Sequence, residues 1–212
     1  MNESVHLIGM SGSLRRDSFN TRLLFAVEEL LPENLTMGIV WIADQPLYNA
    51  DLDLPAAKQR PPVVQQFREV LASADGFVFV SPEYNYSIPG GLKNAIDWAS
   101  SGEDSPLLNK PVAVMGATPG ILRTLRLQAA FLPVFTFLNM KPVLKPEISL
   151  VRAGKKFDAQ GKLIDDKARN LIRQKLEGLR DLILKGRESV SISMAEAAWR
   201  WRRRRRRPLS GV

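Results

Sequence analysis

The stretch Met10–Arg22 reads Met-Ser-Gly-Ser-Leu-Arg-Arg-Asp-Ser-Phe-Asn-Thr-Arg. It follows a short apolar run, Val5–Ile8, and precedes an amphipathic run, Leu23–Leu31, so we predict a strand, a polar loop and a helix. A loop rich in hydroxyl and guanidinium groups, placed before a helix N-terminus, is typical of an anion-binding site at the carboxyl end of a strand. The alternative is an ordinary polar turn in which Ser18 or Asn20 caps the helix.

The glycine pattern excludes two common nucleotide-binding motifs. The chain contains neither Gly-x-Gly-x-x-Gly, the dinucleotide fingerprint, nor Gly-x-x-x-x-Gly-Lys-Ser/Thr, the loop of nucleoside triphosphatases. Any phosphate bound at this loop must therefore belong to another class of ligand.

The composition limits the chemistry that side chains can perform. The chain has 212 residues, of which 45% are hydrophobic, enough for one domain with a substantial core. It has no cysteine, which excludes disulfides, thiolate nucleophiles and cysteine-ligated metal centres. Its single histidine, His6, falls within the first predicted strand, so no Ser-His-Asp triad or histidine metal site can be assembled. We expect no catalytic side chain and no metal, and a cofactor that supplies the chemistry of an enzyme.

The sequence carries no sign of a membrane or secreted protein. No apolar run reaches the roughly 18–20 residues that span a bilayer. The start, Met-Asn-Glu-Ser, lacks the basic region of a secretory signal. Together with the absence of cysteine, these features favour a cytoplasmic location.

Apolar runs alternate with helical periodicity along the chain. This alternation predicts an α/β fold in three layers, with a five-stranded parallel sheet of order 2-1-3-4-5 and helices on both faces. The predicted strands are Val5–Met10, Thr36–Ile42, Phe77–Ser81, Val112–Ala117 and a short strand within Lys141–Val151. The predicted helices are Asn20–Leu31, Val63–Ser73, Leu92–Ser100, Leu122–Leu138 and Asp165–Lys185. A long proline-rich loop is expected at Ala43–Pro62, and a hairpin or loop at Lys155–Leu163.

The predicted strand order fixes where a second loop must lie. Strands one and three are neighbours, so the loop after strand three must lie beside the loop after strand one. That loop and the following helix read Ser-Pro-Glu-Tyr-Asn-Tyr-Ser-Ile-Pro-Gly-Gly-Leu-Lys-Asn-Ala-Ile-Asp-Trp, from Ser81 to Trp98. Its tyrosines can cover a flat heterocycle, and its Pro/Gly backbone can approach the edge of one. The alternative is a turn whose tyrosines only pack on the protein.

These two stretches carry a resemblance to a known family. Gly12–Arg15 with Ser18 and Asn20, together with Ser81–Trp98, resemble the NADPH-dependent FMN reductase family, whose fold is flavodoxin-like. Within it, the chain is most similar to the bacterial quinone and chromate reductases. The resemblance runs from about Val5 to Lys185.

The resemblance implies FMN as cofactor, with NADPH or NADH as co-substrate. The first loop would hold the FMN phosphate and ribityl chain, and the loops after strands three and four would line the flavin ring. The residues implied in FMN binding are Ser13, Arg15, Ser18, Phe19, Asn20, Thr21, Arg22, Pro82, Glu83, Tyr84, Asn85, Ala117 and Thr118. One departure concerns the segment after Gly120, where the family usually has a glycine pair. Here Arg123 and Thr124 occupy those positions, which affects the predicted shape of the nicotinamide or acceptor pocket.

The implied activity is FMN-dependent transfer of electrons from NAD(P)H to quinones, azo compounds, free flavin or oxidised metal anions. The alternative is a flavodoxin-like electron carrier, or a flavin-binding protein without steady turnover. Flavodoxins are usually strongly acidic, whereas this body is slightly basic, which favours the enzyme. The family also implies a homodimer or homotetramer.

The C-terminal segment differs in composition from the rest of the chain. Residues 194–212 hold seven arginines and one glutamate, a net charge of +6, so residues 1–193 carry only +2 of the total of +8. We divide the chain into a reductase domain, 1–193, and an Arg/Trp-rich tail, 194–212, for which like-charge repulsion favours disorder. Trp199 and Trp201 between arginines leave nucleic-acid or membrane contact as an alternative role of this tail, not the favoured one.

Overall fold

A parallel sheet forms the centre of the computed structural model, which describes residues 3–122 and 124–205, with side chains as far as residue 189. The sheet has six strands, of which five lie in the order β2-β1-β3-β4-β5. The sixth, β6, pairs directly with the C-terminal residues of β4, whereas β5 pairs with its N-terminal residues. The strands are β1 (Val5–Ser11), β2 (Leu35–Val40), β3 (Gly76–Val80), β4 (Pro111–Ala117), β5 (Lys141–Pro142) and β6 (Ile148–Leu150). The predicted order 2-1-3-4-5 of a flavodoxin-like sheet is confirmed.

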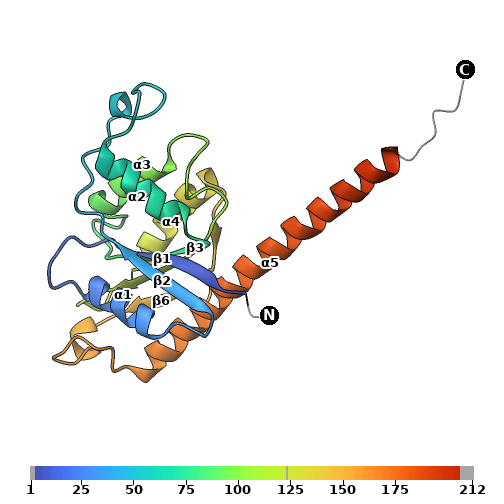
Figure 1. Ribbon diagram of the computed structural model, residues 1–212. Helices are drawn as coiled ribbons and strands as arrows, with labels where there is room; N and C mark the ends of the chain where they lie inside the picture. Colours follow the sequence, from blue (N-terminus) through green and yellow to red (C-terminus); the bar gives the residue numbers. More distant parts are fainter. Residues whose placement is uncertain (1–2, 123, 206–212) are drawn as a thin grey trace, which may run out of the picture.

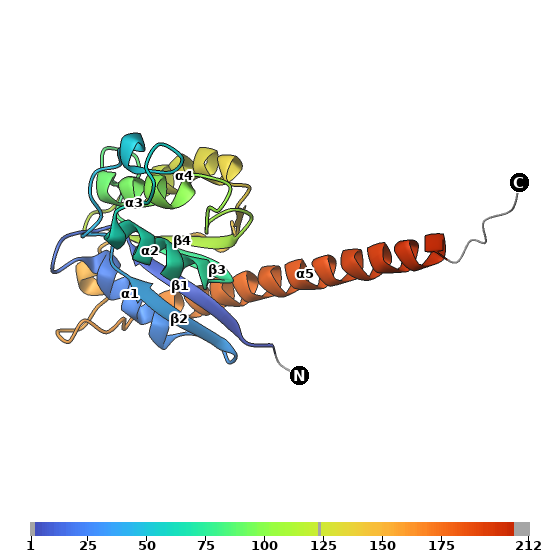
Figure 2. The same ribbon diagram turned by 45° about the horizontal axis from the view of Figure 1, so that its top comes forward.

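Helices cover both faces of this sheet (Figures 1 and 2). They are α1 (Phe19–Glu29), α2 (Pro62–Ala72), α3 (Gly90–Ser100), α4 (Leu125–Phe137) and α5 (Asp166–Arg205), with short 3-10 turns at Ala50–Leu52 and Ala153–Lys155. One apolar cluster joins α1 and α5 to the sheet, and a second joins α2, α3 and α4 to the opposite face.

The strands divide their side chains between these two clusters by period-two alternation. In β3, Val78 and Val80 enter the first cluster, whereas Phe77 and Phe79 enter the second. All of β3 is buried, as expected of a central parallel strand covered on both faces. The sheet is therefore packed on both faces, and the loops at its carboxyl edge start from buried strands.

The fifth predicted strand is two short strands in the structure. Residues 141–142 and 148–150 both pair with β4, but the segment between them leaves the sheet. Pro142 and Pro146 have no N–H to donate to a ladder, which accounts for the interruption. The predicted hairpin at Lys155–Leu163 is confirmed by an antiparallel bridge between Phe157 and Leu163.

The last helix is longer than predicted. Its end was expected near Lys185, but α5 continues to Arg205 and extends away from the sheet (Figures 1 and 2). The prediction of the helix end is therefore wrong, and the helix covers part of the segment for which disorder was expected; residues 206–212 lie outside the described residues. The boundary between a reductase domain and a tail at residue 193 stays a prediction. No helix in the described ranges is long and apolar enough to cross a membrane.

A set of charges, in which Arg60, Arg68 and Asp53 are buried and Asp104 is exposed, holds the long loop between β2 and α2. The Arg60 side chain is 2% exposed; its Nε lies 2.5 Å from Asp53 Oδ1, and its Nη1 lies 2.9 Å from Asp104 Oδ2. Arg68, from α2, donates to the carbonyl oxygens of Trp98, Ala99, Ser101 and Asp104. Arg68 therefore satisfies carbonyls at the C-terminus of α3. Together these contacts fix the loop against the end of α3.

Candidate functional site

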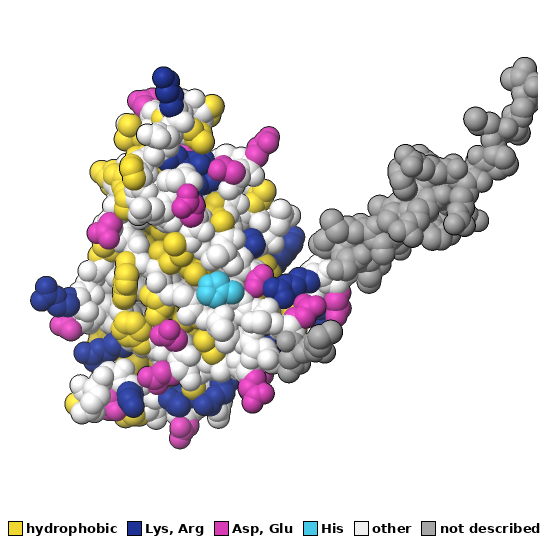
Figure 3. Space-filling model, in the orientation of Figure 1, with side chains coloured by type: hydrophobic (Ala, Val, Ile, Leu, Met, Phe, Trp, Pro, Cys, Tyr) yellow, Lys and Arg dark blue, Asp and Glu magenta, His cyan; other side chains and the backbone are white. Residues whose placement is uncertain are grey.

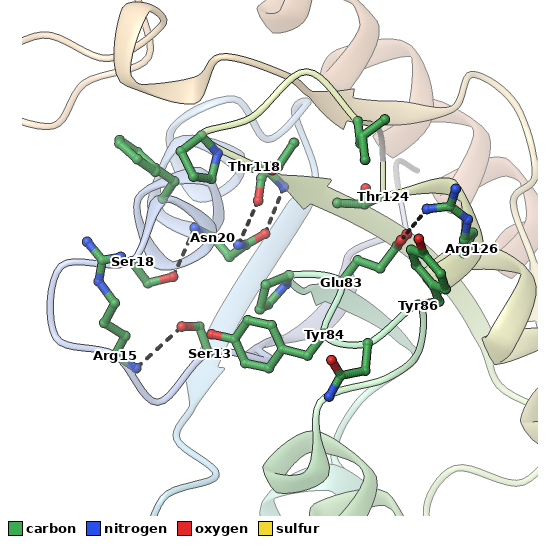
Figure 4. A pocket seen from close by; sticks show the side chains of 16 residues that line it. Ser13, Arg15, Ser18, Asn20, Glu83, Tyr84, Tyr86, Thr118, Thr124 and Arg126 are labelled. Atoms are coloured by element: carbon green, nitrogen blue, oxygen red, sulfur yellow. Dashed lines mark hydrogen bonds and ion pairs between the residues drawn. The ribbon is translucent and has the colours of Figure 1, made fainter.

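A cavity of about 700 Å³ opens at the carboxyl ends of β1, β3 and β4 (Figure 4). This volume lies within the range of small-molecule sites, roughly 300–1,000 Å³. The described residues that line it come from the three loops that follow these strands and from the adjoining ends of α1, β4 and α4. They are Ser13, Arg15, Ser18, Phe19, Asn20, Pro82, Glu83, Tyr84, Asn85, Tyr86, Ala117, Thr118, Pro119, Leu122, Thr124 and Arg126.

The N-terminus of α1 forms one end of the cavity. Ser18 is the N-cap, and its side-chain oxygen accepts a hydrogen bond from the Asn20 N–H at 3.1 Å. The N–H groups of Ser18 and Phe19 pair with no acceptor in the described part of the chain. The first turn of α1 contains no acidic residue, and Arg15 lines the cavity beside it. Free donors, a helix N-terminus and a guanidinium together suit a phosphate group. The prediction of a cap at Ser18 and the prediction of an anion site are thus compatible.

The two predicted ligand loops are in direct contact. The Gly12 N–H donates to the Val80 carbonyl oxygen at 2.9 Å. A Cβ atom added at Gly12 would lie 2.7 Å from Ser81 Cβ and 2.2 Å from Ser81 Oγ. Only glycine allows this approach of the loop after β1 to the loop after β3.

Asn20 has a structural contact that the sequence did not indicate. Its side-chain oxygen accepts from the Ala117 N–H at 2.8 Å, and its side-chain nitrogen donates to the Ala117 carbonyl oxygen at 3.0 Å. The Asn20 side chain thus links α1 to the end of β4 across the floor of the cavity. Asn20 lines the cavity, but both ends of its amide are occupied by backbone groups.

The loop after β3 presents its tyrosines through a tight turn. Tyr84 and Ser87 exchange backbone hydrogen bonds at 2.9 and 3.2 Å. The residues between them, Asn85 and Tyr86, have φ angles of 48° and 63°. A bulky residue such as tyrosine rarely adopts this left-handed conformation, and such strain is often found at functional sites. Tyr84 and Tyr86 are 50% and 64% exposed, and the Arg126 guanidinium covers one face of the Tyr86 ring.

The Glu83 carboxylate makes contacts that the sequence did not indicate. The family resemblance places it at the flavin edge, mainly through its backbone. In the structure its carboxylate reaches the start of α4, where Oε2 accepts from the Leu127 N–H at 3.1 Å and Oε1 lies 3.3 Å from Arg126 Nη1. A carboxylate is favourable at a helix N-terminus, and the N-cap Thr124 makes no side-chain capping bond. Glu83 therefore joins the aromatic turn to α4.

Of the two residues that replace the family's glycine pair after Gly120, the structure describes Thr124. Thr124 is buried, and its N–H donates to Ser149 Oγ at 2.8 Å. A Cβ at Gly116 would lie 2.4 Å from Thr124 Oγ1, so the threonine packs closely against β4. Thr124 thus forms part of the cavity wall where the family usually has a bare backbone. Arg123 lies outside the described residues.

Eleven of the thirteen predicted cofactor-binding residues line this cavity. Thr21 and Arg22 are not among the described residues that do so. Thr21 Oγ1 lies 2.9 Å from Ser11 Oγ, and the Arg22 guanidinium carbon lies 5.7 Å from the centre of the Phe19 ring. His6 is also absent from the lining; its Nδ1 lies 2.9 Å from Thr36 Oγ1, and its ring is visible in cyan in Figure 3.

The set of predicted site residues missed five contributors to the lining. Pro119, Leu122 and Thr124 belong to the segment between β4 and α4, and Arg126 belongs to the first turn of α4. The fifth is Tyr86, from the loop after β3, which was expected only as one of the tyrosines that can cover a flat heterocycle. The position of this segment depends on how β4 and α4 pack, which no local pattern indicates.

Fold and site together define a flavodoxin-like protein whose switch-point cavity joins an anion site to an aromatic turn. Comparison with known proteins gives the family: residues 5–155 match the family described as NADPH-dependent FMN reductase. The chain is 43% identical over 180 residues to an NAD(P)H-dependent FMN reductase of Pseudomonas aeruginosa, covering 85% of this chain and 96% of that protein. It is 38% identical over 167 residues to a quinone reductase of Escherichia coli, covering 78% and 88%.

A solved structure agrees with this assignment. The flavoenzyme NAD(P)H:(acceptor) oxidoreductase FerB from Paracoccus denitrificans is similar with a TM-score of 0.75 and 30% identity, covering 85% of this chain and 98% of that one. The chain belongs to the NADPH-dependent FMN reductase family, and it is an FMN-dependent NAD(P)H oxidoreductase. Family membership decides between the enzyme and the electron carrier in favour of the enzyme.

Proposed function

We propose that FMN binds with its phosphate at the N-terminus of α1 and its ring beside the loop after β3, and that quinones are electron acceptors. The observation that carries this proposal is the single cavity, which joins free N–H donors and Arg15 at one end to Tyr84, Asn85 and Tyr86 at the other. Ser13, Ser18 and Arg15 would hold the phosphate, and Pro82–Asn85, Ala117 and Thr118 would surround the ring. When bound, FMN supplies the hydride and electron chemistry.

The protein's own residues bind, orient and exclude water. The described lining contains two arginines and one glutamate as its charged residues, and no histidine or lysine. We therefore assign no essential acid or base and expect the protein to act by positioning. Steady oxidation of NAD(P)H with a quinone tests the acceptor class, since a protein that only carries flavin would show almost none.

Arg15 offers a direct test of the phosphate position. Replacing it with alanine should weaken FMN binding by about 1.5–3 kcal/mol, the scale of a charge-assisted hydrogen bond. Riboflavin has the same ring but no phosphate, so its affinity should hardly change. Fluorescence titrations with both flavins measure the two effects, and Arg16→Ala is a matched control because Arg16 is not in the described lining. Equal losses for both flavins, or no loss for FMN, would remove Arg15 from the phosphate site.

We propose further that the protein is a homodimer or homotetramer. One side of α4 and the segment after it expose large apolar side chains that line a common hollow, namely Leu125, Leu132 and Leu144, of which Leu144 is 61% exposed. Exposed apolar patches of this kind commonly mark contacts between proteins. Light scattering that gives only the 23.7 kDa monomer at micromolar concentration would contradict this.

The C-terminal segment is, in our proposal, separate from the catalytic function, and the protein is cytoplasmic. The described residues that line the cavity all lie between Ser13 and Arg126. Truncation after Ser193 should therefore leave flavin content and kcat with a quinone nearly unchanged. Any attraction of NADPH phosphates by the arginines should change only KM, and should disappear at high salt because exposed charges are screened beyond roughly 8 Å. A tenfold loss of kcat with flavin still bound would show that the segment belongs to the active site.

A further inference from the structure

Arg126 occupies the end of the cavity opposite Arg15 (Figure 4). It belongs to the first turn of α4, and its side chain is 49% exposed. Its guanidinium carbon lies 3.8 Å from the centre of the Tyr86 ring, and its Nη1 lies 3.3 Å from Glu83 Oε1. A cation–π contact and an ion pair therefore hold one guanidinium from two sides.

The groups that hold Arg126 are themselves fixed. The backbone turn at Asn85 and Tyr86 sets the position of the ring. Glu83 is bound to the Leu127 N–H through its other oxygen, so the carboxylate cannot turn away without losing a helix cap. A side chain that is already ordered loses little conformational entropy when a ligand binds.

The charge of Arg126 is only partly balanced. Glu83 is shared between Arg126 and the N-terminus of α4. Within the residues that the structure describes, no acceptor is paired with Arg126 Nε or Nη2. Guanidinium groups bind carboxylate-like oxygens through two parallel N–H donors. The Nε and Nη2 donors of Arg126 can bind an anionic group in this way.

We propose that Arg126 is a specificity-determining residue that receives an anionic substituent of the electron acceptor; this rests on the function proposed above. Arg15 and the N-terminus of α1 supply the phosphate site at the far end of the cavity, so Arg126 is not needed there. The end that Arg126 shares with Tyr86 is the end where a planar acceptor must approach the flavin ring. The enzyme therefore favours quinones that carry a negative charge over neutral quinones of the same ring.

The test compares naphthoquinone with naphthoquinone sulfonate as acceptors for the FMN-loaded enzyme. In Arg126→Met, kcat/KM for the sulfonate should fall about tenfold more than kcat/KM for the neutral quinone, with most of the difference in KM. Arg126→Lys should recover part of this difference because it keeps the charge but not the planar fork. Arg173→Met, which removes an exposed arginine from α5, is the control and should leave kcat/KM for both quinones unchanged. Salt should raise KM for the sulfonate in the wild type and much less in Arg126→Met.

Other outcomes overturn the proposal. If kcat/KM falls equally for the two quinones in Arg126→Met, with or without loss of FMN, Arg126 only supports the wall of the cavity. A tenfold rise in KM for NADPH but not for NADH, with an unchanged quinone ratio, would place the guanidinium on a nucleotide phosphate. If the wild type reduces neither quinone while oxidising NADPH with free flavin, the proposed acceptor class itself fails.

Discussion

Replacing Arg60 with methionine should lower the free energy of unfolding by about 3–5 kcal/mol at neutral pH. The substitution removes the partner of Asp53, whose side chain is 2% exposed, and leaves a buried carboxylate without its cation. Breaking a buried pair on one side costs more than the pair contributes, because the remaining charge stays desolvated. Urea unfolding, followed by far-ultraviolet circular dichroism, measures the change.

The same substitution should make stability depend differently on pH. Burial alone would raise the pKa of the Asp53 carboxyl, but hydrogen bonds from Arg60 and the Leu54 N–H, with the Arg60 charge, hold this pKa below its usual value. A lowered pKa in the folded state contributes stability above about pH 4, and this contribution is lost as the pH falls through the folded-state value. In Arg60→Met the unpaired carboxyl should have a raised pKa and take up a proton readily. The difference between the two proteins should therefore shrink as the solution is acidified below pH 5.

Lys93→Met is the matched control. Lys93 pairs with Asp97 at 2.6 Å, but the two side chains are 47% and 33% exposed. An exposed pair on one helix contributes at most about 0.5 kcal/mol. If the two substitutions lower the free energy of unfolding equally, the contacts of Arg60 with Asp53 and Asp104 do not fix the loop between β2 and α2.

Replacing Gly12 with alanine should cost about 3 kcal/mol of unfolding free energy and weaken FMN binding by roughly a hundredfold. The added Cβ would lie 2.7 Å from Ser81 Cβ and 2.9 Å from Leu92 Cδ2, so the loops after β1 and β3 must move apart. These loops carry the two ends of the proposed FMN site, so both ends lose their relative position. Urea unfolding and FMN titration measure the two effects on one preparation.

Gly90→Ala is the control for this substitution. Gly90 begins α3, next to the same ligand loop, and a Cβ there meets no atom within 4 Å. Alanine also favours the helix over glycine by up to about 1 kcal/mol. Gly90→Ala should therefore keep or raise stability and leave FMN binding intact. A Gly12→Ala protein that binds FMN as the wild type does would show that the loops are not required to touch.

The sheet order could be predicted because it depends on signals that lie close together in the sequence. The apolar run predicted as the strand Phe77–Ser81 indicated a central strand, and the polar loops after the first and third strands had to meet if they shared a ligand. The end of α5 could not be predicted in this way. The predicted helix stopped at Lys185, but α5 passes through Gly186, where no neighbouring atom lies within 4 Å of an added Cβ.

The site was predicted in outline and missed in its contacts. Ser13, Ser18 and Tyr84 lie in recognisable loops, and the cavity confirms that these loops come together. The amide of Asn20 and the carboxylate of Glu83 are instead used to join α1 to β4 and the aromatic turn to α4. Arg126 was missed as a site residue because its position follows from the packing of α4 against Glu83 and Tyr86, which are more than 35 residues away in the chain.

A crystal structure of the protein with FMN tests the central claim most directly. The account predicts one flavin in the cavity, with its phosphate within hydrogen-bond distance of the Ser18 and Phe19 N–H groups and its ring beside Pro82–Asn85. The Arg126 guanidinium should then remain on the Tyr86 ring, clear of the phosphate. A flavin bound elsewhere, or bound in the reverse direction with its phosphate on Arg126, would contradict the account.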